Sequence, residues 1–128
     1  MATDLVQMEQ IAGQVQDALQ TADLTGYREL LDPNVTWGAP DDMKPSCQNR
    51  DQVLAWYRSG RAKGVRANVT ETVVRNEKIL VGLSVSDVES PSDSGDVANR
   101  WQILTVKNGL VVDIRGFEER DAAISSME

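Results

Sequence analysis

Apolar residues near the start of the chain recur at steps of three and four positions, the spacing of one face of a helix. The residues on this stripe are Leu5, Met8, Ile11, Ala12, Val15, Ala18 and Leu19. A second, shorter helix follows, because Asp23 can cap its first turn and the run Asp32-Pro33-Asn34 can end it. The chain is therefore predicted to open with two antiparallel helices.

A short strand and a third helix are predicted next. Val35-Thr36-Trp37 favours a strand, since β-branched and aromatic residues stand between two turn-forming segments. The third helix is expected to begin with Asn49 as its cap and Gln52 as the reciprocal partner of that cap. Glycine is common where helices end, so Gly60 or Gly64 is the predicted end of this helix.

The second half of the chain changes to a period of two, the pattern of strands that bury one face. The alternating, largely apolar sets are Val65, Ala67, Val69, Glu71 and Val73, then Ile79, Val81, Leu83 and Val85 after a turn at Asn76-Glu77-Lys78. A further strand runs from about Val97 to Val106, and the hairpin signal Asn108-Gly109 joins it to a strand over Leu110–Phe117. Residues 118–128 are predicted to form a short helical tail.

Helices first and antiparallel strands afterwards is the order of an α+β fold, in which three N-terminal helices cover one face of a curved, mainly antiparallel sheet. Gly82 and Gly116 inside the strands indicate strong curvature or the close approach of another group. The chain has 128 residues and shows no internal repeat or linker. We therefore expect residues 1–128 to form a single domain.

The charge balance narrows the range of partners. The chain carries 20 acidic and 13 basic side chains, for a formal net charge of -7, and the basic residues are scattered. An acidic surface repels phosphate backbones, so we expect no nucleic-acid partner. A membrane helix needs about 18 consecutive apolar residues, and neither such a run nor a signal-peptide pattern is present. We expect a cytoplasmic protein with no membrane association.

Histidine is absent and Cys47 is the single cysteine, which excludes many catalytic sites. A Ser-His-Asp triad, a Cys-His pair, a histidine zinc site and an intrachain disulfide are all ruled out. Asp41-Asp42 are paired carboxylates, but adjacent loop acids seldom converge on one cation. We therefore expect no metal site and no cofactor, and a spectator role for the Cys47 thiol.

Four segments, in this order along the chain, resemble the nuclear transport factor 2-like superfamily, including its SnoaL-like branch. They are the helix junction Leu19–Tyr27, the segment Leu30–Trp37, the helix Asn49–Tyr57 and the closing hairpin Thr105–Phe117. The resemblance spans nearly the whole chain and implies a cone-like barrel that encloses a pocket between the helices and the concave sheet face. The superfamily includes isomerases, cyclases, dehydratases, epoxide hydrolases and non-catalytic binders, so the fold alone does not decide the function.

The positions that carry chemistry in catalytic members of this superfamily hold other residues here. The resemblance places Val15 at the tyrosine of the isomerases, Ala39 at their base and Gly116 at the aspartate of the cyclases and hydrolases. Val15 and Ala39 can supply neither a base nor an oxyanion donor. Arg100-Trp101-Gln102 stands where the hydrolases have Arg-x-Asp, and only Tyr57 matches a supporting tyrosine of the isomerases.

The aromatic residues are the strongest candidates for ligand binding. Trp37, Trp56 and Trp101 fall at positions that line the cavity in the resembling family. Large flat side chains suit a hydrophobic, ring-shaped ligand, and the alternative is that they fill the cone as core. Tyr57 could donate a hydrogen bond to a ligand oxygen, whereas Tyr27 is expected at the helix junction with its hydroxyl in water.

Strand alternation adds further candidates. Asn99, Trp101 and Ile103 are predicted to point inward, where Asn99 could bind a ligand carbonyl or be satisfied by the backbone. On the last strand, the set predicted to share a side with Gly116 is Val112, Ile114 and Glu118, and the set predicted to point away is Asp113, Arg115 and Phe117. Glu118 is a candidate general base or ligand anchor at the mouth of the cone, or else a solvated carboxylate.

Three hypotheses for the function remain. The first is a SnoaL-like binding or accessory protein for a small hydrophobic ring compound, dimeric through the outer face of its sheet. Its ligand-binding residues would be Trp37, Trp56, Tyr57, Asn99, Trp101 and Ile114. The second is an isomerase, polyketide cyclase or epoxide hydrolase-like enzyme that uses Tyr57, Asn99 and Glu118. The third is a protein-interaction module with a closed cone.

Overall fold

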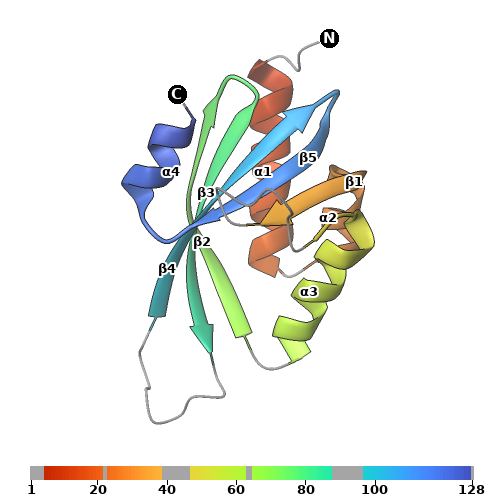
Figure 1. The fold of residues 1–128 in the computed structure, drawn as a ribbon, viewed down its shortest axis with the longest axis vertical. Coiled ribbons are helices and arrows are strands. Elements are labelled where there is room, and N and C mark those ends of the chain that lie inside the picture. The colour runs from red at the N-terminus through yellow and green to blue at the C-terminus, as the bar shows by residue number, and fades with distance from the viewer. Residues whose placement is uncertain (1–4, 22, 39–46, 63–64, 88–96, 128) are drawn as a thin grey trace.

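Four helices and five strands form the part of the chain that the computed structural model describes, which is residues 5–21, 23–38, 47–62, 65–87 and 97–127 (Figure 1). In chain order they are α1 (Leu5–Thr21), α2 (Leu24–Leu30), β1 (Leu31–Gly38), α3 (Arg50–Ala62), β2 (Val65–Arg75), β3 (Lys78–Asp87), β4 (Val97–Lys107), β5 (Leu110–Phe117) and α4 (Arg120–Ser126). None of these helices is long and apolar enough to span a membrane.

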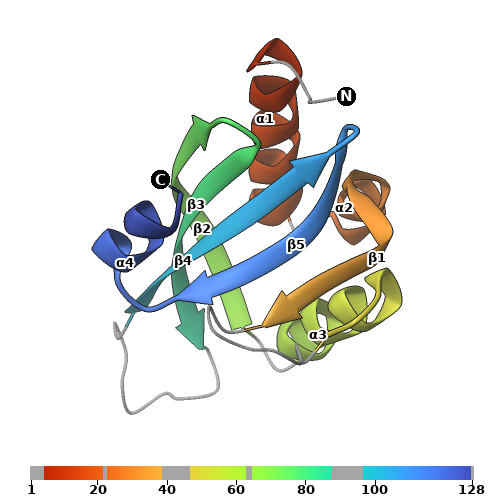
Figure 2. The same ribbon diagram turned by 45° about the horizontal axis from the view of Figure 1, so that its top comes forward.

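The strands form one sheet in the order β1-β5-β4-β3-β2. β1 runs parallel to β5, and the other neighbours are antiparallel. Helices α1, α2 and α3 lie on one side of the sheet and α4 lies on the other (Figure 2). The predicted α+β architecture, with three N-terminal helices over one face of a mainly antiparallel sheet, is confirmed.

The helices form where capping residues and apolar stripes predict them. Every buried residue of α1 belongs to the predicted stripe. The Asp23 carboxylate accepts from the Gly26 N–H at 3.0 Å and caps α2. Asn49 Oδ1 accepts from the Gln52 N–H at 2.9 Å. The Gln52 side chain reaches the N–H of Gln48, so the reciprocal bond predicted to Asn49 was wrong. α3 continues past Gly60 to Ala62, and Gly64, the other predicted end, lies outside the described residues.

Turn residues set the two hairpins. Asn76 and Asn108 both have a φ of 54°, and Gly109 has a φ of 82°. These left-handed conformations suit the tight turns that join β2 to β3 and β4 to β5, which confirms both predicted turns. The predicted helical tail is also present, as α4.

β1 is longer than predicted. Its first residue is Leu31, so the run Asp32-Pro33-Asn34 lies within the strand and does not precede it. The pairing of β1 with β5 shifts register between Leu31 and Thr36. β1 is an edge strand, where a proline costs no hydrogen bond with a second neighbour, so Pro33 can be accommodated there.

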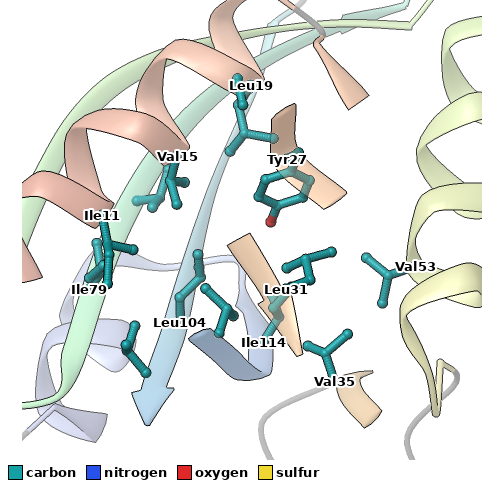
Figure 3. Packing of buried hydrophobic residues seen from close by; sticks show 14 of the residues in the cluster. Ile11, Val15, Leu19, Tyr27, Leu31, Val35, Val53, Ile79, Leu104 and Ile114 are labelled. Carbon is teal, nitrogen blue, oxygen red and sulfur yellow. The ribbon is translucent and has the colours of Figure 1, made fainter. Parts of the chain in front are cut away.

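Each face of the sheet carries its own apolar cluster. The inner face, under α1, α2 and α3, is the larger one and includes Ile79, Val81, Leu83, Leu104, Val106, Val111 and Ile114 (Figure 3). The outer face, under α4, has buried Leu80, Ile103, Ala123 and Met127, with Val73, Trp101, Phe117 and Ile124 packed against them.

Two bulges break the predicted alternation along the strands. The pairing of β2 with β3 shifts between Val69 and Glu71, so Val69 packs in the inner cluster and Val73 in the outer one. The prediction that these two residues share a face was wrong. A second shift, in the pairing of β4 with β5, places Val111 with Ile114 in the inner cluster, so the alternation predicted through Val112 fails.

Candidate functional site

Four aromatic side chains from three elements meet at one end of the inner face, and we call them the aromatic cluster. They are Tyr27 of α2, Trp37 of β1, and Trp56 and Tyr57 of α3. The rings of Trp37 and Tyr57 stack at 5.1 Å, and Trp56 lies edge-on to Trp37 at 4.6 Å. Tyr27 meets Tyr57 edge-on at 5.5 Å. Three of the predicted ligand-binding residues, Trp37, Trp56 and Tyr57, therefore lie together.

The aromatic cluster runs from the surface to the interior. Trp56 is 58% exposed, whereas Tyr27 is 0% exposed. The backbone of Trp37 is held by two hydrogen bonds with Cys47, of 2.9 and 3.0 Å. Cys47 is buried, and burial raises the pKa of its thiol, which fits the predicted spectator role.

Hydrogen-bonding groups stand at the buried end of the aromatic cluster. Gln102 of β4 is 6% exposed, and its Nε2 donates to the Tyr57 hydroxyl over a long 3.5 Å. Gln102 Oε1 has no hydrogen-bond partner in the part of the chain that is described, and neither has the Tyr27 hydroxyl. An unsatisfied buried polar group costs about 1–3 kcal/mol. We call Tyr27, Tyr57 and Gln102 the polar end of the site.

Both phenols of the polar end stay protonated well above neutral pH. Burial raises the pKa of Tyr27 strongly, and the neighbouring Tyr57 raises it further. Burial also raises the pKa of Tyr57, against the hydrogen bond from Gln102 and the contact with the Tyr27 hydroxyl, which both lower it. The two hydroxyls lie close enough to influence each other's pKa, but the Tyr27–Tyr57 contact lacks the geometry of a proper hydrogen bond. At neutral pH both phenols can therefore act as donors.

Gly116 leaves room beside the polar end. It pairs with Gln102 across the two strands, on the inner side of β5. Among the described atoms, a Cβ placed on Gly116 would meet only Trp37 Nε1, at 3.9 Å. A methyl group could therefore be added there in ordinary van der Waals contact with Trp37.

The inward orientation predicted for Asn99, Trp101 and Ile103 was wrong. Trp101 and Ile103 pack in the outer cluster, and Asn99 is exposed. The opposite set of β4, which includes Gln102 and Leu104, faces inward. The reason is that α4 covers the outer face, so large apolar side chains are buried on both sides of the sheet. Trp101 Nε1 donates to Glu71 at 3.4 Å on the outer side.

The other predicted residues divide between interior and surface. Ile114 is 0% exposed and belongs to the inner cluster. Glu118 is exposed directly after β5, away from the apolar surroundings expected for it. Tyr27 is fully buried, which corrects the prediction that its hydroxyl is wet. Figure 3 shows this hydroxyl pointing away from its helix and toward the strands.

Gln102 is the residue that sequence reasoning missed. In the sequence it is notable only as the amide at the position where the resembling hydrolases have an aspartate. It stands two positions before Leu104, which faces inward. Val15, at one of the positions compared with catalytic members, is fully buried among apolar residues. Ala39 and Asp41-Asp42 lie outside the described residues. Within the described ranges, no group of three or more Cys, Asp or Glu could hold a metal ion.

Comparison with known proteins defines the family of this chain. Residues 12–114 match the SnoaL-like domain, so the chain belongs to the SnoaL-like family. No curated protein matches the sequence.

Solved structures show the same fold. The "putative ketosteroid isomerase" of Kribbella flavida has a TM-score of 0.75 at 18% identity, over 92% of this chain and 82% of its own. The "putative polyketide cyclase" of Sinorhizobium meliloti has a TM-score of 0.66 at 21% identity, over 87% of this chain and 98% of its own. An uncharacterized cystatin fold protein of Novosphingobium aromaticivorans has a TM-score of 0.71 at 9% identity, over 87% and 97%. These similarities confirm the predicted cone-like fold.

Proposed function

We propose that this protein binds a small hydrophobic ring compound between the aromatic cluster and the inner face of β4 and β5. The observation that carries the proposal is the pairing of stacked aromatic rings with unsatisfied buried polar atoms. Trp37 and Tyr57 offer flat apolar surface, and Gln102 and Tyr27 offer hydrogen bonds that no described group takes up. Ligand sites commonly combine an apolar lining with a few convergent polar groups in this way.

An enzymatic function is the second candidate, and it rests on the two buried phenols. Protonated Tyr27 and Tyr57 could donate to an oxyanion that develops on a bound carbonyl. Two of the three groups expected to carry that chemistry are placed elsewhere, since Asn99 and Glu118 are exposed. Binding therefore has the stronger support from the geometry.

The three tryptophans allow a direct test of the binding site. Each indole N–H gives a separate NMR signal, which single Trp→Phe variants assign. Addition of a naphthalene-sized ring compound should shift the signals of Trp37 and Trp56 and leave that of Trp101 in place. Trp101 is the internal control, because it lies on the opposite face of the sheet.

Two results would contradict the proposal. Equal shifts of all three indole signals would indicate a nonspecific effect of the compound. A shift confined to Trp101 would place the site under α4. Product formation in the same samples, lost in Tyr57→Phe, would favour the enzymatic candidate.

We further propose that two chains associate through the part of the outer face nearest β1 and β5. Thr36 there donates to Asp113 at 2.6 Å, and Asp113 pairs with Arg115 at 3.1 Å. These side chains are half-buried and ordered by one another, whereas α4 covers the neighbouring β3 and β4 and the end of β5 at Phe117. Light scattering coupled to gel filtration should give a dimer at micromolar concentration, and a strict monomer would overturn this proposal.

A further inference from the structure

We propose that the ring compound carries one uncharged hydroxyl group, held by Tyr27 and Gln102 at the polar end of the site. This inference rests on the proposed binding function and names the class of ligand. It makes the compound an alcohol or a phenol, and sets it apart from a ketone, a carboxylate or a plain hydrocarbon of the same size.

The unsatisfied atoms define what the ligand must offer. The Tyr27 hydroxyl can donate a hydrogen bond that no described group accepts. Gln102 Oε1 can accept a hydrogen bond that no described group donates. Both belong to side chains that are at least nine-tenths buried. A hydroxyl group is the smallest group that accepts one hydrogen bond and donates another. A carbonyl could accept from Tyr27 but would leave Gln102 Oε1 unsatisfied.

The polar end also disfavours charge. The groups that act on the pKa of Tyr27 and Tyr57 are these two phenols themselves, Gln102 and the Cys47 thiol, all of them uncharged at neutral pH. A carboxylate buried against them would lose its hydration without gaining a counter-ion. An ammonium group would likewise lose its hydration there without gaining a counter-ion.

Gly116 marks the part of the inner face where we place the ring. It stands beside Gln102 in the sheet, and the described atom nearest its missing side chain is Trp37 Nε1. A ring lying there would contact the Trp37 indole while its hydroxyl reached Gln102. The hydrogen-bonding and apolar parts of the ligand would thus be served by adjacent residues.

Four naphthalenes that differ only in the substituent at position 2 test the inference at pH 7: 2-naphthol, 2-methylnaphthalene, 2-acetylnaphthalene and 2-naphthoate. The dissociation constant of each is measured from the Trp37 indole signal. We expect 2-naphthol to bind about tenfold more tightly than 2-methylnaphthalene, as two net hydrogen bonds of ordinary strength allow. Its advantage over 2-acetylnaphthalene should be about threefold, because the ketone can still accept from Tyr27. We expect 2-naphthoate to bind most weakly of the four.

Variants identify which atoms hold the hydroxyl. Gln102→Leu and Tyr27→Phe keep side-chain shape and remove one polar group each, so each should reduce the tenfold preference to threefold or less. Neither should weaken the binding of 2-methylnaphthalene. Trp101→Phe is the matched control on the outer face and should keep the full preference.

The possible failures are distinguishable. If 2-naphthol and 2-methylnaphthalene bind equally to the unmodified protein, or if the ketone or the carboxylate binds best, the ligand class is wrong while the binding function stands. If the preference survives both Gln102→Leu and Tyr27→Phe, the assigned atoms are wrong. If none of the four compounds shifts Trp37 or Trp56, the proposed function fails and the inference fails with it.

Discussion

The two faces of the sheet treat their polar groups in opposite ways. On the outer face, the Trp101 N–H donates to Glu71, and Arg120 donates to the same carboxylate at 2.7 Å. Each of these groups has a partner. On the inner face, Tyr27 and Gln102 are more deeply buried and yet have atoms without one. The outer arrangement holds α4 in place, whereas on the inner face the Tyr27 hydroxyl and Gln102 Oε1 have no partner among the described residues.

Two glycines show the same contrast in packing. A Cβ at Gly82 would lie 2.7 Å from Thr70 Oγ1 and 2.9 Å from Glu71 Cγ. The Glu71 side chain can therefore pack here only because position 82 has no side chain. This is the close approach that a glycine inside a strand predicts. A Cβ at Gly116 would meet its nearest described neighbour at an ordinary 3.9 Å. An added methyl group would therefore clash at Gly82 on the outer face and would make an ordinary contact at Gly116 on the inner face.

The largest effect is expected from the matched substitutions Gly82→Ala and Gly116→Ala. Gly82→Ala should lower the free energy of unfolding by about 1–3 kcal/mol, because the new methyl group overpacks the Glu71 contact. Gly116→Ala should change it by no more than about 0.5 kcal/mol. Urea unfolding of both variants measures the difference. Equal destabilisation would show that the inner face is as tightly packed as the outer one.

A smaller effect should follow from the charge that anchors α4. Arg120 lowers the pKa of Glu71 through its hydrogen bonds, so the folded state holds the proton less tightly than the unfolded one. The stabilisation is therefore present above the ordinary pKa of a glutamate and is lost as the pH falls through the lowered value. Between pH 6 and pH 3, the urea midpoint of the unmodified protein should fall further than that of Glu71→Gln.

The control for the Glu71 experiment is Glu9→Gln, an exposed change on α1. Its urea midpoint should follow that of the unmodified protein over the whole pH range. Lys78, whose Nζ donates to the Ser126 carbonyl at 3.0 Å, holds the other end of α4 and is unchanged in both variants. Identical pH profiles for Glu71→Gln and the unmodified protein would mean that Glu71 does not anchor α4.

The sequence predicts the elements of this fold better than it predicts the faces of its strands. The stripe of α1 and the turns at Asn76 and Asn108 depend on local spacing and backbone preference, which a single sequence reveals. The faces depend on the bulges and on α4, which buries Trp101 where alternation alone expects an exposed side. Hydrophobicity alone predicts that Trp101 lies on the inner face and Gln102 on the outer face. The structure has the opposite arrangement: Trp101 packs in the outer cluster, and Gln102 lies beside Tyr57 on the inner face.

The smallest effect should come from Glu118→Gln. This substitution tests whether the ligand binds on the inner face or at the end of the sheet, next to Glu118. Glu118 is exposed directly after β5, and its side chain takes no part in the aromatic cluster or the polar end. The dissociation constant for 2-naphthol should therefore stay within twofold of the unmodified protein, against the loss expected for Gln102→Leu. A fivefold weakening in Glu118→Gln, or loss of turnover of any compound found to react, would make Glu118 the anchor or base. The unsatisfied atoms of Tyr27 and Gln102 would then be a structural cost without a functional return.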